Sequence, residues 1–197
     1  MVLRVFLLGF AILNLVTHGA MPAAANSTIG NMDCMVTSII SGDDITVNSE
    51  GTQINVQLYG LEAPVMSQSD PTHSWHRKPG QPYAREAFIS LANKILFHQV
   101  KLEIVHIVSS PQPPYLHAIA TVWLGGRNIN LEMLAEGMGW ATRAFPNEPY
   151  AAEYAHAQGR ARSRKLGLWS QSNPLPPWEF RKMGTAKFTI RNDGKTP

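Results

Sequence analysis

The chain has 197 residues, a formal net charge of +3 and a sequence pI near 9.1. Its single cysteine, Cys34, excludes an internal disulfide, so packing must hold the fold together. Without its first 25 residues the chain has about the size of one domain with a modest core. The basic excess is compatible with polyanion binding but is common among inert secreted domains.

Residues 1–25 have the pattern of a targeting segment. Arg4 supplies the positive region, residues 5–16 are largely apolar, and three alanines ending at Ala25 form a small-residue cleavage site. The apolar run is short for a membrane span of roughly 20 residues. We therefore expect a secreted or periplasmic protein with no membrane span in its mature chain. A single domain is expected over 26–182, followed by a loose tail over 183–197.

Three short β-branched or alternating runs, at 36–40, 45–47 and 53–58, predict a meander of three strands. Tight turns at 41–44 and 49–52 separate them, and Pro64 ends the last strand. Three carboxylates, Asp43, Asp44 and Glu62, come where the runs finish. Carboxylates at strand ends often hold a hard cation.

Residues 66–80 have no hydrophobic period, so we expect a long loop there. His73 and His76 lie in that loop, where solvated side chains are a more ordinary outcome than metal ligands. Residues 81–97 carry an apolar helical stripe that should pack on the sheet.

The second half of the chain predicts two strands, at 100–107 and 116–123, a short helix after Asn130 and a longer helix over 151–165. The longer helix ends in a cluster of cations: Arg160, Arg162, Arg164 and Lys165. These charges complement the helix dipole, and a polyanion-binding patch is the alternative.

The acidic turn 41–44 and the segment 56–65, which reads Val-Gln-Leu-Tyr-Gly-Leu-Glu-Ala-Pro-Val, resemble motifs of the staphylococcal nuclease (thermonuclease) family. Segments 81–87, 137–141, 166–170 and 177–181 also match, so the resemblance runs from about residue 33 to residue 181. It implies an α+β fold, a five-stranded OB-fold-like β-barrel with about three packed helices.

The family is calcium-dependent, and its ion lies on two aspartates. Asp43 matches the first aspartate, and Glu62 stands in place of the second with a carboxylate extended by roughly 1.5 Å. Asp44 replaces a threonine and is a further candidate ligand. An alternative site built from Asp43, Asp44, Glu62 and His117 would take a different divalent metal.

The resemblance places the catalytic residues at positions where this chain differs. Val65 stands for the general base, and Gln57 and His117 stand for two phosphate-binding arginines, so none of the three is intact. Losing a base costs about 10² to 10⁴ in rate, and losing a donor about 10² to 10³. Hydrolysis should therefore be nearly abolished, as in a pseudoenzyme.

Substrate-contact candidates are Tyr115, His117 and Arg143, with Phe145 as a second stacking aromatic. Two functions follow. The first is a nuclease-like module with impaired or lost phosphodiesterase activity that binds nucleic acid, another acidic partner or an unknown protein. The second is an active metal-dependent nuclease with a modified site, and we leave open whether the chain is an enzyme.

Overall fold

The computed structural model describes residues 29–69, 77–108, 116–142 and 150–183. The expected targeting segment, His73, His76 and the tail from residue 184 lie outside the described residues. Within the described ranges, no helix has the length and apolar character needed to cross a membrane.

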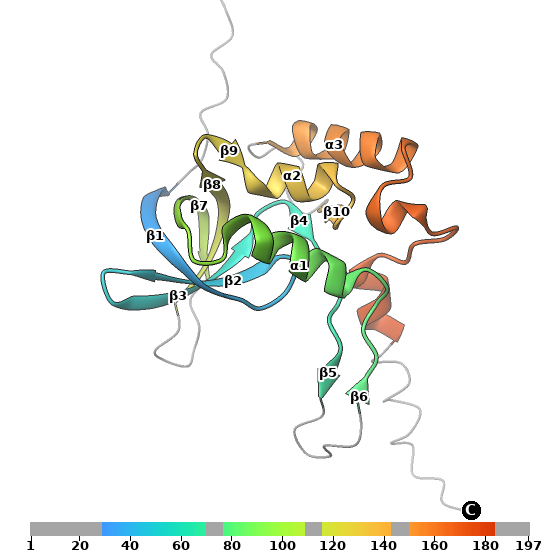
Figure 1. The fold of residues 1–197 in the computed structure, drawn as a ribbon, viewed down its shortest axis with the longest axis horizontal. Coiled ribbons are helices and arrows are strands. Elements are labelled where there is room, and N and C mark those ends of the chain that lie inside the picture. Colours follow the sequence, from blue (N-terminus) through green and yellow to red (C-terminus); the bar gives the residue numbers. More distant parts are fainter. Residues whose placement is uncertain (1–28, 70–76, 109–115, 143–149, 184–197) are drawn as a thin grey trace, which may run out of the picture.

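The core of the molecule is a small closed barrel (Figure 1). Its sheet runs in the order β3-β2-β1-β7-β8-β9, and a parallel pairing of β3 with β8 closes it. The strands are β1 (Gly30–Ile39), β2 (Asp44–Ser49), β3 (Thr52–Leu58), β7 (Gln99–Val108), β8 (Leu116–Leu124) and the two-residue β9 (Arg127–Asn128). The predicted meander and the five-stranded OB-fold-like α+β architecture are confirmed.

Alternation along β3 explains which side chains reach the core. Ile54, Val56 and Leu58 are buried, as the pattern predicts. Gln57 points to the other face and lies opposite Asp44 on β2. The outer surface at the end of β3, the strand that leads toward Glu62, is therefore polar.

Three helices flank the barrel: α1 (Ala84–Ile95), α2 (Ile129–Ala135) and α3 (Ala151–Ser163). α2 contacts β8, α1 and α3, so it is the middle element of the helical side (Figure 1). A 3₁₀ turn, η1 (Gly167–Ser170), follows α3, and residues 177–183 are again helical. Predicted helix positions agree with the structure, although α1 is shorter because Tyr83 and Phe97 adopt positive φ values of 68° and 61°.

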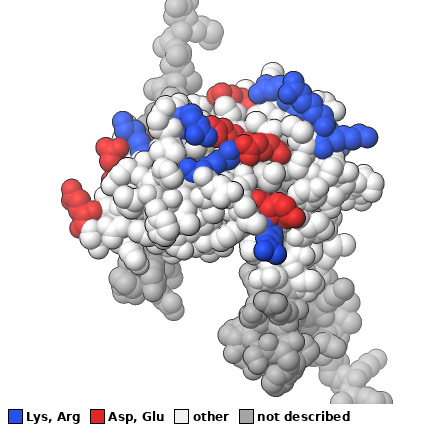
Figure 2. Space-filling model, viewed as in Figure 1, with Lys and Arg blue, Asp and Glu red and all other residues white. Residues whose placement is uncertain are grey.

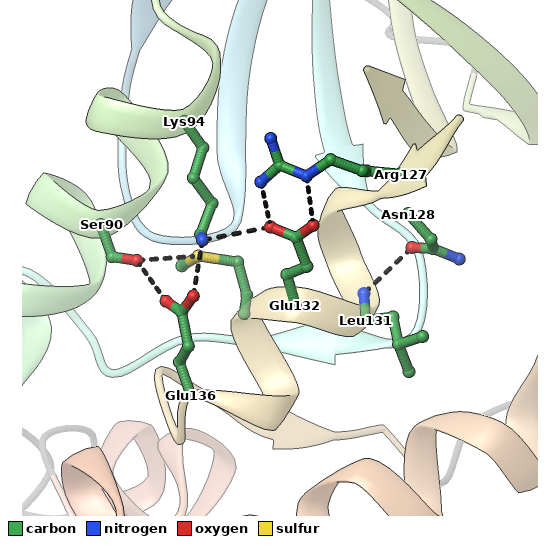
Figure 3. Close-up of polar contacts among 8 residues, drawn as sticks. Ser90, Lys94, Arg127, Asn128, Leu131, Glu132 and Glu136 are labelled. Atoms are coloured by element: carbon green, nitrogen blue, oxygen red, sulfur yellow. Dashed lines mark hydrogen bonds and ion pairs between the residues drawn. The ribbon is translucent and has the colours of Figure 1, made fainter. Parts of the chain in front are cut away.

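A network of charges fastens α1 to α2 (Figure 3). The Nζ of Lys94 lies 3.2 Å from Glu132 and 2.6 Å from Glu136, and Ser90 donates to Glu136 at 2.9 Å. Arg127 donates twice to Glu132, each time at 2.6 Å. Arg127 and then Lys94 lower the pKa of Glu132. The whole network has a stabilising role between helices and lies apart from the strand-end carboxylates.

Two additional strand pairs depart from the expected pattern. The segment 66–80 was expected to be a loop throughout, but β5 (Gln68–Ser69) pairs with β6 (Arg77–Lys78). Two-residue ladders carry no detectable hydrophobic period, so the sequence does not reveal them. The second pair, β4 (Leu61–Glu62) with β10 (Trp140–Ala141), fixes the position of Glu62.

Candidate functional site

The turn between β1 and β2 is organised by the hydroxyl of Ser41. Its Oγ accepts from the backbone amides of Asp43 and Asp44, at 3.3 and 3.0 Å, and donates to Oδ1 of Asp43 at 2.6 Å. The other carboxylate oxygen of Asp43 accepts from the amide of Ala63 at 3.0 Å. Asp43 is therefore held from both sides, and it links the turn to the residue that follows β4.

Gly42 allows this turn to pack closely against its neighbours. A Cβ at this position would lie 2.6 Å from the Cβ of Ala87 and 2.8 Å from that of Ala63. Any larger residue would push α1 away from the turn. The acidic turn is thus seated directly on the helix.

Glu62 is held by a cation from the far end of the chain. Its Oε2 accepts from Nη2 of Arg181 at 2.6 Å, across 119 residues of sequence. The Arg181 side chain is 56% exposed and that of Glu62 is 22% exposed. The C-terminal helical turn therefore brings a guanidinium to the acidic surface, which we define as the surface around Asp43, Asp44 and Glu62.

The pKa of Asp43 is raised to about 6, chiefly by burial; the hydrogen bonds from Ser41 and Ala63 lower it, and the negative charges of Asp44 and Glu62 contribute to the rise. Burial also raises the pKa of Asp44. The hydrogen bond from the amide of Ala63 to Asp43 joins the acidic turn to the end of β4, where Glu62 lies.

Replacing Asp43 by Asn is expected to stabilise the protein above neutral pH. The folded-state pKa lies above the unfolded value of 3.8, so ionisation penalises folding fully above about pH 6 and not at all well below that unfolded value. We expect Asp43→Asn to add about 1 to 3 kcal/mol at about pH 8 and little at about pH 4. Urea unfolding in EDTA at both pH values measures this.

The matched control for that measurement is Asp33→Asn, because Asp33 is exposed on β1. It should change the free energy of unfolding little at either pH. Equal effects of Asp43→Asn at both pH values would contradict the assigned cause, since the penalty exists only where the carboxylate is ionised.

Gln57 and His117 lie on the outer face of the barrel, on neighbouring strands. Gln57 pairs with Ile119 across the parallel β3–β8 ladder, and His117 pairs with Asn55, two residues along. The Nε2 of His117 is buried and has no hydrogen-bond partner among the described residues. Both candidate phosphate positions therefore share one face of the sheet.

Val65 is placed by its backbone rather than by its side chain. Its amide donates to Oε1 of Gln81 at 2.9 Å, and its carbonyl accepts from the Gln81 amide at 2.8 Å. Nε2 of the buried Gln81 donates to the carbonyl of Leu175 at 2.8 Å. The partly buried isopropyl group of Val65 offers no proton acceptor at this position.

Carboxylate oxygens are the type of ligand that a hard cation prefers, but the carboxylates here are not arranged as a metal site. Nowhere in the described ranges do three His, Cys, Asp or Glu side chains form a group able to hold a metal ion. Both oxygens of Asp43 already accept hydrogen bonds, and Arg181 engages Glu62. As arranged, the residues do not fit a calcium ion, and the set of Asp43, Asp44, Glu62 and His117 is not assembled as ligands.

Several residues predicted to contact substrate lie outside the described residues. Tyr115, Arg143 and Phe145 lie in segments that the structure does not describe. The α3 cations are described: Arg160, Arg162 and Arg164 are exposed, and the guanidinium of Arg162 lies 5.6 Å from the centroid of a Trp169 ring. Figure 2 shows basic side chains gathered at the end of α3.

A closed five-stranded barrel with flanking helices defines the class of OB-fold-like domains. The model of the family described as "Staphylococcal nuclease homologue" matches residues 55–171, so the chain belongs to that family.

Three relatives indicate the range of similarity. The chain is 30% identical over 150 residues to an uncharacterized endonuclease of Haemophilus influenzae, covering 76% of this chain and 72% of the relative. It is 27% identical over 171 residues to the thermonuclease of Staphylococcus intermedius, covering 85% and 96%. It is 30% identical over 156 residues to the micrococcal nuclease of Shigella flexneri, covering 75% and 79%.

Sequence reasoning missed three residues that organise the site. Ser41 could have been found, because a serine two or three residues before acidic positions commonly caps a turn. Gln81 was noticed only as part of a family motif, and Arg181 only as the end of another. Nothing local in the sequence indicates that Arg181 pairs with Glu62.

Proposed function

We propose that this chain is a nucleic-acid-binding module of the nuclease family in which phosphodiester hydrolysis is strongly reduced. The observation that carries the proposal is the replacement of the family's base and two arginines by Val65, Gln57 and His117 in an otherwise intact frame. The side chains of Val65 and Gln57 cannot perform acid–base catalysis at neutral pH. Binding can persist where catalysis is lost, because the two depend on different groups.

The cations at the end of α3 support binding of a polyanion. Arg160, Arg164 and Lys165 are exposed, and the described residues contain no ion pair that neutralises them. Glu153 lies in the first turn of the same helix, at the opposite end from these cations. A phosphate backbone that contacts them would release counterions, so affinity should fall as salt rises.

A second candidate, an active metal-dependent nuclease, is favoured by the hydrogen bond from the amide of Ala63 to Asp43, which brings the acidic turn next to the end of β4 where Glu62 lies. Such an enzyme would hold Ca²⁺ or another divalent ion only after Arg181 leaves Glu62. Carboxylate oxygens are suitable ligands for hard cations.

Digestion of single-stranded DNA and RNA distinguishes the two candidates. The purified protein is incubated with Ca²⁺, Mg²⁺, Mn²⁺ or EDTA, with Asp43→Ala as the control. The proposal expects salt-sensitive binding by fluorescence anisotropy and no cleavage above the Asp43→Ala background. Metal-dependent cleavage that disappears in Asp43→Ala would establish the second candidate instead.

A further inference from the structure

The ion pair between Arg181 and Glu62 places a positive charge on the acidic surface. A second contact holds the segment just before the helical turn of Arg181. In it, Gln81 donates to the carbonyl of Leu175 at 2.8 Å. Gln81 in turn bonds both backbone groups of Val65. The C-terminal segment is therefore fastened beside positions 62 and 65, and Arg181 is delivered to a defined place.

We propose that Arg181 is the phosphate-binding cation of the acidic surface, in place of the arginines that are absent at positions 57 and 117. This inference rests on the proposed function and assigns its ligand class at this site, the phosphodiester backbone of a single-stranded nucleic acid. A guanidinium is charged at every physiological pH and presents several donors in a rigid plane. Glu62 orients the guanidinium plane. The Arg181 side chain is exposed, so a nucleic-acid strand can reach it.

The same geometry predicts phosphate binding without a divalent ion. A cation that bridges carboxylate and phosphate usually reduces the repulsion between them, and here Arg181 already lies against Glu62 at 2.6 Å. Each oxygen of Asp43 accepts a hydrogen bond of its own, from Ser41 and from the amide of Ala63. Binding through Arg181 should therefore persist in EDTA.

The test is fluorescence anisotropy of a labelled single-stranded oligothymidylate with the full chain in EDTA over a range of salt concentrations. We expect Arg181→Gln to weaken binding about 10-fold, as for a lost charge-assisted bond, and to reduce the salt slope by about 0.7, the value for one contact to a single strand. Arg181→Lys should keep the slope and restore only part of the affinity, because an ammonium lacks the planar fork.

Glu62→Gln provides the opposing variant and also covers a failure of Arg181→Gln to fold. It removes a negative charge and releases the guanidinium, so it should tighten binding. If Glu62→Gln weakens binding as much as Arg181→Gln does, the ion pair only holds the C-terminal segment in place, and the inference is wrong. Thermal unfolding of each variant verifies its folding.

Lys101→Gln is the matched control, because Lys101 is an exposed cation on β7 that forms no ion pair among the described residues and lies opposite Asp33 and Trp123. It should change affinity less than about 2-fold, as expected for a distant surface charge under screening. Wild-type binding that is unaffected by Arg181→Gln would overturn this inference and leave the proposed function standing. Absence of any binding, with or without metal, would overturn both.

Discussion

A triple variant, Gln57→Arg with Val65→Glu and His117→Arg, is expected to cleave single-stranded DNA at least about 10³-fold faster than the wild-type protein. The three changes introduce a carboxylate and two guanidinium groups at the positions that the family resemblance assigns to the base and the two arginines. Gln57 and His117 lie on adjacent strands of the barrel, and Val65 follows β4. Effects of groups that act together are not additive, so the gain should fall short of the product of three separate gains.

The measurement is the initial rate of cleavage in Ca²⁺, Mg²⁺, Mn²⁺ and EDTA for wild type, each single variant and the triple variant. Adding Asp43→Ala to the triple variant should remove the gain. Asp44 lies opposite position 57, so it offers the introduced arginine a neighbouring carboxylate. A wild-type protein that already cleaves as fast as the triple variant would show that the missing side chains are not what limits hydrolysis.

Asn130→Ala should lower the free energy of unfolding by about 2 to 5 kcal/mol, roughly the cost of two orphaned buried groups. Asn130 is fully buried at the start of α2. Its Oδ1 accepts from the amide of Val122 at 2.9 Å, and its Nδ2 donates to the carbonyls of Tyr59 and Ala120 at 2.8 and 3.2 Å. Alanine would leave the Val122 amide and the Tyr59 carbonyl without these partners.

Urea unfolding measures this effect, and the melting temperature should fall by about 10 °C for a domain of this size. Asn93→Ala is the control, because Asn93 is exposed on α1 and alanine suits a helix. Asn130→Asp should be at least as destabilising as alanine at neutral pH, since its second carboxylate oxygen would face the carbonyls of Tyr59 and Ala120 in a buried site. A change below about 0.5 kcal/mol for Asn130→Ala, the range of ordinary surface substitutions, would contradict the role assigned to its three bonds.

Much of the barrel could be predicted because its strands follow a period of two. Ile54, Val56 and Leu58 alternate with polar residues, and the structure buries all three. The acidic turn was also predictable, since glycine and aspartate follow a β-branched run at that point. These features depend on neighbours within a few residues, which is the range over which sequence patterns carry information.

The contacts that hold the C-terminal segment against the acidic surface join residues that are distant in sequence. The Glu62–Arg181 pair spans 119 residues and the bond from Gln81 to Leu175 spans 94, so no local pattern predicts either. Asn130 was noticed only as part of the approach to a helix, because an asparagine at such a position is more often a cap than a buried bridge. The structure shows that the cap is Asn128, whose side chain accepts from the amide of Leu131 (Figure 3).

The fastening of positions 62 and 65 to the C-terminal segment has a consequence for biosynthesis. A ribosome makes the chain from its N-terminus, so the barrel strands through Leu124 emerge well before Leu175 and Arg181. Glu62 remains without its guanidinium partner during that interval, and Gln81 without its carbonyl. The guanidinium that pairs with Glu62 is therefore synthesised after all the strands of the barrel, and a nascent chain passes through a stage in which this carboxylate lacks its partner.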